Sequence, residues 1–190
     1  MKKTVIKTAI ITFLTLFILS VIAAVFVGAF APARMGAICS DLGMKNVSAL
    51  MYERQYEKSG DVKDLVKLVD VSVAAGSDEK VAYYSYVLVA EKNEQFREVC
   101  KNAEDYRYYS FIAVEANYDV SEYEKSVEIA EKYGFEKNIY NERSPFYLAV
   151  RLALFNVNKD YSSLLISAYE RGEFVSSSEL EEDIDKLKNL

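Results

Sequence analysis

Residues 56–76 read YEKSGDVKDLVKLVDVSVAAG, and they contain the end of one predicted helix, a turn and the whole of the next helix. The apolar residues of the second helix recur at the spacing of a buried helical face: Val62, Leu65, Val66, Val69 and Val73. Asp61 stands at the N-cap position, and Gly60 and Gly76 stand where helices usually end. This stretch therefore predicts two amphipathic helices joined by a tight turn.

The same pattern extends across most of the chain. Seven Gly and two Pro among 190 residues leave little of the turn chemistry that β-sandwiches and barrels need. Further helices are predicted near 48–58, 77–92, 93–103, 111–117, 119–134, 145–155, 160–172 and 178–187. We expect an all-α fold with about four antiparallel helical hairpins and a C-terminal capping helix.

Part of the pattern repeats. Residues 61–76 align without gaps on 119–134, which lie 58 positions later. In the second copy Asp119 and Glu122 predict a capping box, and Gly134 predicts the end of the helix.

The first unit resembles a tetratricopeptide (TPR) repeat, most clearly at 52–76, where Tyr56 precedes Gly60 by four residues. The other units depart from the family pattern, because Leu65 and Tyr123 stand where the family often has Ala and no Pro closes the repeats. The resemblance implies a TPR-like solenoid, with a generic antiparallel helical domain as the alternative.

Near the C-terminus, the sequence predicts both where the last two helices begin and which side of the last helix is buried. Asp160 is the expected N-cap of its helix, and Ser178 with Glu181 forms an expected capping box. The last helix has one apolar stripe, formed by Leu180, Ile184 and Leu187. Its charged residues are expected to face solvent: Glu182, Asp183, Asp185, Lys186 and Lys188.

Residues 9–31, AIITFLTLFILSVIAAVFVGAFA, contain no charged side chain. As a helix this run extends about 34 Å, which is enough to cross a hydrocarbon core of about 30 Å. A cleaved signal peptide is the alternative, but its apolar region is normally only about 7–15 residues long. We therefore expect an uncleaved signal anchor that places residues 9–31 in the membrane.

The basic residues beside this run predict its orientation. Lys2, Lys3 and Lys7 precede it, whereas Arg34 and Lys45 follow it, so the bias favours an N-terminus in the cytoplasm. We expect a single-pass cell-membrane protein with a cytoplasmic segment at 1–8, a transmembrane helix at 9–31, a juxtamembrane connector at 32–45 and an extracytoplasmic helical domain at 46–190.

Charge and composition exclude several classes of function. Four of the 23 basic residues and none of the 29 acidic ones lie in 1–34, so residues 35–190 carry a net charge of −10. Such a body repels phosphate backbones, and we expect no nucleic acid partner. There is no histidine, no Gly-rich phosphate loop and no calcium-loop spacing, so no metal, cofactor or catalytic residue is expected.

The two cysteines, Cys39 and Cys100, allow two interpretations. An extracytoplasmic compartment would permit a disulfide between them. Cys100, however, falls on the apolar stripe of its predicted helix, where a free cysteine packs as a small hydrophobic side chain. We therefore expect the two cysteines to be free rather than joined by a disulfide.

Tyrosine is unusually frequent, with 15 residues and no tryptophan. Five tyrosines gather in two short segments: Tyr83, Tyr86, Tyr106, Tyr108 and Tyr109. Such close spacing cannot place every ring on one helix face, so some are expected at the surface, where tyrosine is enriched in binding sites. Packing between hairpins is the structural alternative.

Two functional hypotheses follow. The first is a noncatalytic, membrane-tethered helical-repeat module that binds another protein or a peptide at the outer face of the membrane. The alternative is a membrane-anchored enzyme or sensor that uses carboxylates and tyrosines without histidine. A shallow tyrosine-lined groove would favour the first, and a deep cleft with convergent acids would favour the second.

Overall fold

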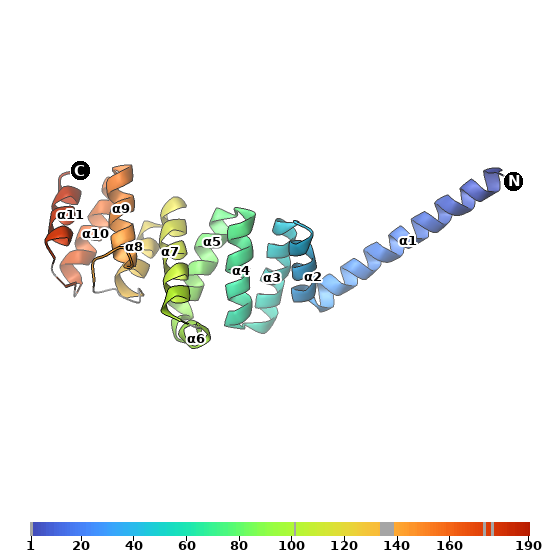
Figure 1. The fold of residues 1–190 in the computed structure, drawn as a ribbon, viewed down its shortest axis with the longest axis horizontal. Coiled ribbons are helices and arrows are strands. Elements are labelled where there is room, and N and C mark those ends of the chain that lie inside the picture. Colours follow the sequence, from blue (N-terminus) through green and yellow to red (C-terminus); the bar gives the residue numbers. More distant parts are fainter. Residues whose placement is uncertain (1, 101, 134–138, 173, 176) are drawn as a thin grey trace.

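The computed structural model describes residues 2–100, 102–133, 139–172, 174–175 and 177–190, with side chains from Ile10 onward. Throughout these residues the chain forms helices and turns, without a β-strand, as expected for an all-α fold. Figure 1 shows an elongated row of helices with one long helix projecting from its end. The helices are α1 (Lys2–Phe30), α2 (Pro32–Asp41), α3 (Lys45–Ser59), α4 (Val62–Ala75), α5 (Asp78–Tyr86), the π-helix η1 (Val87–Glu91), α6 (Asn93–Val99), α7 (Ala103–Asp119), α8 (Tyr123–Lys132), α9 (Pro145–Asn156), α10 (Lys159–Arg171) and α11 (Ser178–Lys188).

Helix α1 differs from all the others in its surroundings. Between Ile10 and Phe30 it is long and apolar enough to cross a membrane, and its large apolar side chains are exposed rather than packed. Only its last turns contact the body, where Gly28 is buried beside Met51 and Met35. An apolar surface this long is unfavourable in water, so α1 requires a different environment from the rest of the chain.

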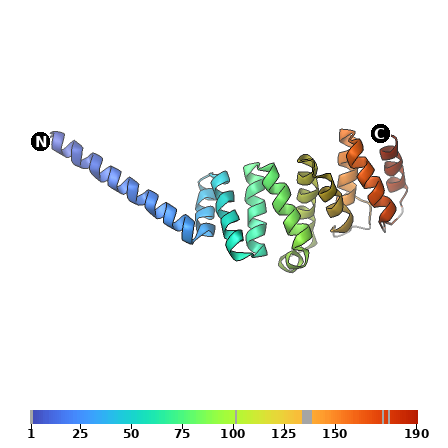
Figure 2. The same cartoon turned by 180° about the vertical axis from the view of Figure 1, so that it is seen from behind.

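The remaining helices form an array in which neighbours along the chain pack against one another, from α2 on α3 to α10 on α11. Figures 1 and 2 show the two termini at opposite ends of the molecule. One continuous apolar core extends from Tyr52 in α3 to Leu187 in α11. Its largest fully buried side chains include Tyr106, Tyr161, Phe96 and Phe146.

One turn geometry recurs along the array. Every described residue with a positive φ angle lies two positions before the start of a helix: Gly43, Gly60, Gly76, Ser121 and Val157. Gly60, Gly76 and Val157 are C-cap residues, whereas Gly43 and Ser121 directly follow the C-cap. In all five cases the next residue is the N-cap of the following helix. This turn reverses the chain within two or three residues, which keeps consecutive helices in contact.

The structure corrects the predicted second copy of the repeat. Asp119 is the last residue of α7 rather than a cap, and α8 begins at Tyr123 instead of near Val120. The left-handed residue Ser121 corresponds to Gly60, so the equivalent turns are 61 positions apart rather than 58. The predicted helix end at Gly134 lies outside the described residues.

The expected connector at 32–45 is instead mostly helical. Pro32 occupies the first turn of α2, where a missing backbone N–H is tolerated, and Ala31 alone separates this helix from α1. Gly36 allows α2 to approach α3 closely, because a Cβ atom there would lie 2.9 Å from the ring of Tyr52. Ser48 in α3 donates a hydrogen bond of 2.8 Å to the carbonyl of Gly36. The helical array therefore begins at Pro32 rather than at residue 46.

Three other local predictions are changed. The N-cap of α10 is Asn158 rather than Asp160, because the Asn158 side chain accepts from the backbone N–H of Tyr161. The N-cap of α11 is Ser177, whose hydroxyl accepts from the N–H of Leu180. The helix expected over 77–92 changes at Val87 into the π-helix η1.

Candidate partner-binding surface

Tyrosine hydroxyls connect neighbouring helices in this fold. Four of them donate to carboxylates on other segments at 2.6–2.8 Å, in the pairs Tyr84–Glu53, Tyr86–Glu128, Tyr109–Asp70 and Tyr140–Asp183. A hydrogen bond to a charged acceptor is stronger than one between neutral groups. Much of the high tyrosine content is therefore explained by contacts between helices.

The prediction that Tyr106 belongs to a binding surface is wrong. Its side chain is 2% exposed, and its ring stacks on Phe96 with centroids 5.3 Å apart. The hydroxyl accepts a hydrogen bond from the side-chain amide of Asn93. Tyr106 faces inward from α7 because the adjacent helix α6 places Phe96 directly against it, so it belongs to the core.

Most of the Tyr86 side chain is also engaged in contacts within the fold. It is half-buried, its hydroxyl donates to Glu128 in α8, and the ammonium of Lys125 lies 5.6 Å from its ring centroid. Burial first, and then the bond to Glu128, raise the pKa of Tyr86 to about 12. The neutral phenol is thus favoured in the fold, where it holds α8 against the end of α5.

Tyr83 and Tyr108 are the two predicted residues that are well exposed, at 58% and 53%. Each contacts the next tyrosine edge-on, Tyr83 with Tyr84 and Tyr108 with Tyr109. They lie on different helices, α5 and α7, and neither of the hollows that Tyr108 lines includes Tyr83. The structure therefore does not gather the five predicted tyrosines into one site.

Tyr108 stands between two hollows. The first has a volume of about 360 Å³ and is bordered by α4, α6 and α7. Its lining residues are Val66, Phe96, Val99, Cys100, Asp105, Tyr108 and Tyr109. The second has a volume of about 640 Å³ and adjoins the segment before α9, with the lining residues Glu104, Asp105, Arg107, Tyr108, Phe111, Glu142 and Arg143. We call these two hollows and the ring between them the Tyr108 surface.

The two halves of the Tyr108 surface differ in chemistry. The first is mainly apolar, and the second combines two arginines with three carboxylates. An exposed tyrosine beside an apolar hollow provides a rigid contact of large area, and charged residues around it are typical of the rim of a protein interface. This arrangement suits an apolar side chain of a partner flanked by polar groups.

Cys100 contributes an apolar wall rather than a nucleophile. It is free and half-buried, and it directly follows α6. Burial, and secondarily the charge of Asp105, raise the pKa of the Cys100 thiol to about 11. Since the thiolate is the reactive form, this environment disfavours nucleophilic chemistry at neutral pH. Cys39 is also free and is buried in α2, so the structure contains no disulfide between the two.

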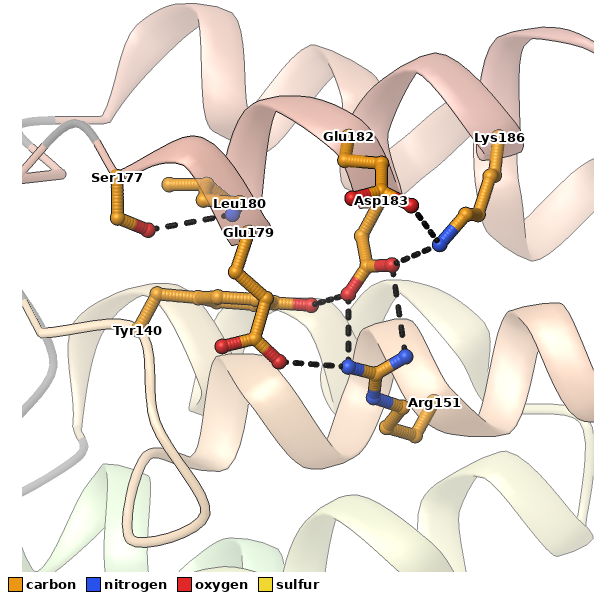
Figure 3. Close-up of polar contacts among 8 residues, drawn as sticks. All are labelled: Tyr140, Arg151, Ser177, Glu179, Leu180, Glu182, Asp183 and Lys186. Atoms are coloured by element: carbon orange, nitrogen blue, oxygen red, sulfur yellow. Dashed lines mark hydrogen bonds and ion pairs between the residues drawn. The ribbon is translucent and has the colours of Figure 1, made fainter.

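A second polar cluster lies at the far end of the array, and the sequence did not reveal it. Asp183 in α11 was expected to face solvent, but it is only 1% exposed. Figure 3 shows Tyr140, Arg151 and Lys186 converging on its carboxylate. Tyr140 donates at 2.8 Å, the Arg151 guanidinium lies 3.0 Å away and the Lys186 ammonium lies 3.1 Å away.

This cluster is a connection between segments rather than a catalytic dyad. Arg151 comes from α9 and also pairs with Glu179 at 2.8 Å, so both carboxylates are held by one cation. A buried carboxylate is stable only when paired and hydrogen-bonded, which explains why three donors surround Asp183. Among the described residues, no group of three or more acids and cysteines is arranged to hold a metal ion.

Comparison with known proteins adds no relative. No family model, curated protein or solved structure matches the chain. The functional argument therefore depends on the geometry of the chain itself.

Proposed function

We propose that this chain is a noncatalytic helical-repeat module that is tethered to a membrane by α1 and binds a protein or peptide through the Tyr108 surface. The observation that carries the proposal is the exposed Tyr108 ring between an apolar and a charged hollow. The carboxylates that converge elsewhere, at Asp183 and Glu179, are already paired with Arg151, which weighs against the enzymatic alternative.

The recurrent left-handed turn supports a TPR-like solenoid within this proposal. Five helix junctions use it, as repeated hairpin units would require. In such an array a ligand contacts several successive helices, and the Tyr108 surface is formed in that way by α4, α6 and α7.

Helix α1 supports the tether, and the flanking charge supports the orientation. Lys2, Lys3 and Lys7 favour a cytoplasmic N-terminus, and with that orientation the array would lie at the outer face of the membrane. Protease added to intact cells or spheroplasts should then digest the array. Full protection of the chain, with digestion only after lysis, would reverse the orientation.

Binding is tested with the full-length chain in its own membranes. A photo-cross-linking amino acid in place of Tyr108 should capture a partner, whereas the same amino acid in place of Glu170, an exposed residue of α10, should not. Capture by an affinity-tagged chain should be lost in Tyr108→Arg and retained in Tyr83→Arg, since both rings are exposed but only Tyr108 borders the hollows. Equal capture by the two variants would refute the assignment of this surface.

A further inference from the structure

The two ends of the array have outer surfaces of opposite character. At the C-terminal end, α11 buries its apolar stripe and exposes charged residues: Glu179, Glu181, Glu182, Asp185, Lys186 and Lys188. At the other end, the α2–α3 hairpin exposes large apolar side chains: Ile38, Leu42, Met44, Val47 and Leu50. A terminal helix of a helical array needs a polar outer face to remain soluble. The α2–α3 end therefore requires a partner that the α11 end does not.

Two of the exposed apolar residues share one side of the hairpin with a basic residue. Ile38 in α2 and Leu42, which directly follows α2, lie four and eight positions after the exposed Arg34, and Leu42 is 69% exposed. Val47 and Leu50 follow on α3, directly after the turn. The opposite side of α2 is buried against α3 through Pro32, Gly36 and Cys39. The hairpin is thus amphipathic, with one side in the core and the other uncovered.

The position of α1 indicates what covers this side. Ala31 alone separates α1 from α2, and the Lys58 ammonium in α3 donates a hydrogen bond of 2.5 Å to the carbonyl of Ala29. The last turn of α1 is thereby held against the α2–α3 hairpin. Figures 1 and 2 show α2 lying crosswise to α1 rather than continuing it. If α1 crosses a bilayer, α2 lies along the boundary of that bilayer.

Charge is consistent with a lipid surface at this end. Arg34, Lys45 and Lys58 are exposed around the hairpin together with Asp41, and residues 32–59 carry four basic and three acidic side chains, a net charge of +1, although the body as a whole is acidic. Basic residues beside apolar ones are typical of helices that lie in the headgroup region, where the apolar side enters the boundary with the acyl chains.

We propose that the α2–α3 hairpin is a membrane-interface element, in which Ile38, Leu42 and Met44 insert at the headgroup–acyl boundary and Arg34 and Lys45 contact lipid phosphates. This proposal rests on the proposed membrane tether, because α1 brings the hairpin to the bilayer. The array is then attached at two places, through the span and through this hairpin.

The test uses the absence of tryptophan from the chain. Three full-length single-tryptophan variants are reconstituted in vesicles of phosphatidylcholine and phosphatidylglycerol that contain dibrominated phosphatidylcholine, a quencher of tryptophan fluorescence. Leu42→Trp reports on the hairpin, Ile18→Trp on α1 and Phe155→Trp on the far part of the array, where the side chain is 87% exposed. Circular dichroism checks that each variant is folded.

We expect Ile18→Trp to be quenched most by bromines deep in the bilayer, and Leu42→Trp to be quenched most by bromines near the headgroups, with a blue-shifted emission. Phe155→Trp should remain unquenched. If Leu42→Trp behaves like Phe155→Trp while Ile18→Trp is quenched, the interface proposal is wrong and the tether stands. If Ile18→Trp is also unquenched, the tether itself is wrong, and the interface proposal falls with it.

Discussion

Val157 has a backbone conformation that disfavours its own side chain. Its φ angle is 53°, in the left-handed region, where a β-branched residue is strained. Gly43, Gly60 and Gly76 occupy the same position in equivalent turns without that strain. Val157 is 59% exposed, so little burial would be lost on shortening it.

We therefore predict that Val157→Gly stabilises the fold by about 1 kcal/mol. The substitution relieves the strain of the left-handed conformation, and the greater conformational entropy of glycine in the unfolded chain offsets part of that gain. The melting temperature of the full-length chain in detergent measures the effect. Gly60→Val, which introduces the same strain at the equivalent turn, is the matched control and should lower the melting temperature. A lower melting temperature for Val157→Gly would contradict this account of the turn.

Asp183 gives a second prediction for a single residue. Asp183→Asn removes the buried anion that accepts from Tyr140, Arg151 and Lys186, while Glu179 and Glu182 still pair with the two cations. Only the carboxylate is buried, since the Arg151 and Lys186 side chains are 39% and 51% exposed, so the loss of its charge-assisted hydrogen bonds costs about 1.5–3 kcal/mol. Urea denaturation should show a loss in this range, whereas Asp185→Asn, an exposed change on the same helix, should alter stability by less than about 0.5 kcal/mol. Equal effects of the two changes would mean that Asp183 is solvated.

Residue identity alone did not distinguish core from surface for the tyrosines. Tyr106 and Tyr108 are two positions apart on α7, yet one is buried and the other is exposed. Their positions depend on where α6 packs, which no local spacing indicates. Asp183 was misplaced for the same reason, since its donors Tyr140 and Arg151 are distant in sequence.

At the scale of elements, the periodicity of apolar residues predicted the helices correctly where a helix buries a single apolar stripe. Helix α4 lies within its predicted limits, with Asp61 and Gly76 as its caps, and the predicted stripe of α11 is buried. Helix α2 was missed because its sequence has no long apolar stripe, and it packs through the small residues Gly36 and Cys39. The start of α8 was misplaced because Ser121 performs the role of a glycine, which the sequence pattern does not signal.

Helix α11 closes the far end of the core. Leu180, Ile184 and Leu187 are almost fully buried, and each contributes about 1.5–3 kcal/mol as an upper estimate. Deleting residues 178–190 should therefore lower the melting temperature and the solubility of the chain. Deleting only residues 189–190 should have a much smaller effect. An unchanged melting temperature in the longer deletion would identify α11 as a free tail.

For the whole molecule, the tyrosine–carboxylate pairs predict sensitivity to alkali. Desolvation first, and then the bond to a carboxylate, raise the pKa values of Tyr84, Tyr86, Tyr109 and Tyr140 above their usual value near 10. Above pH 10 the unfolded chain loses these protons first, so the folded chain binds more protons. The stabilisation is complete below about pH 10 and falls as the pH rises toward the folded pKa values.

Urea unfolding midpoints measured at increasing pH should therefore decline above about pH 10, and phenolate absorbance should appear at higher pH in the folded chain than in urea. Tyr86→Phe should reduce the steepness of the decline. Tyr83→Phe removes an exposed hydroxyl and should leave it unchanged. Phenolate formation at the same pH in folded and unfolded chains would contradict the assignment.

The single-residue junction at Ala31 has a mechanical consequence. Because α1 contacts the body through Gly28 and through the Lys58–Ala29 bond, rotation of the array about Ala31 would break these contacts. We therefore expect α1 and the array to move together, with the α2–α3 hairpin as the pivot. If α1 crosses a bilayer, as proposed, a small change in its tilt in a thicker or thinner bilayer becomes a larger displacement at α11, the far end of the array.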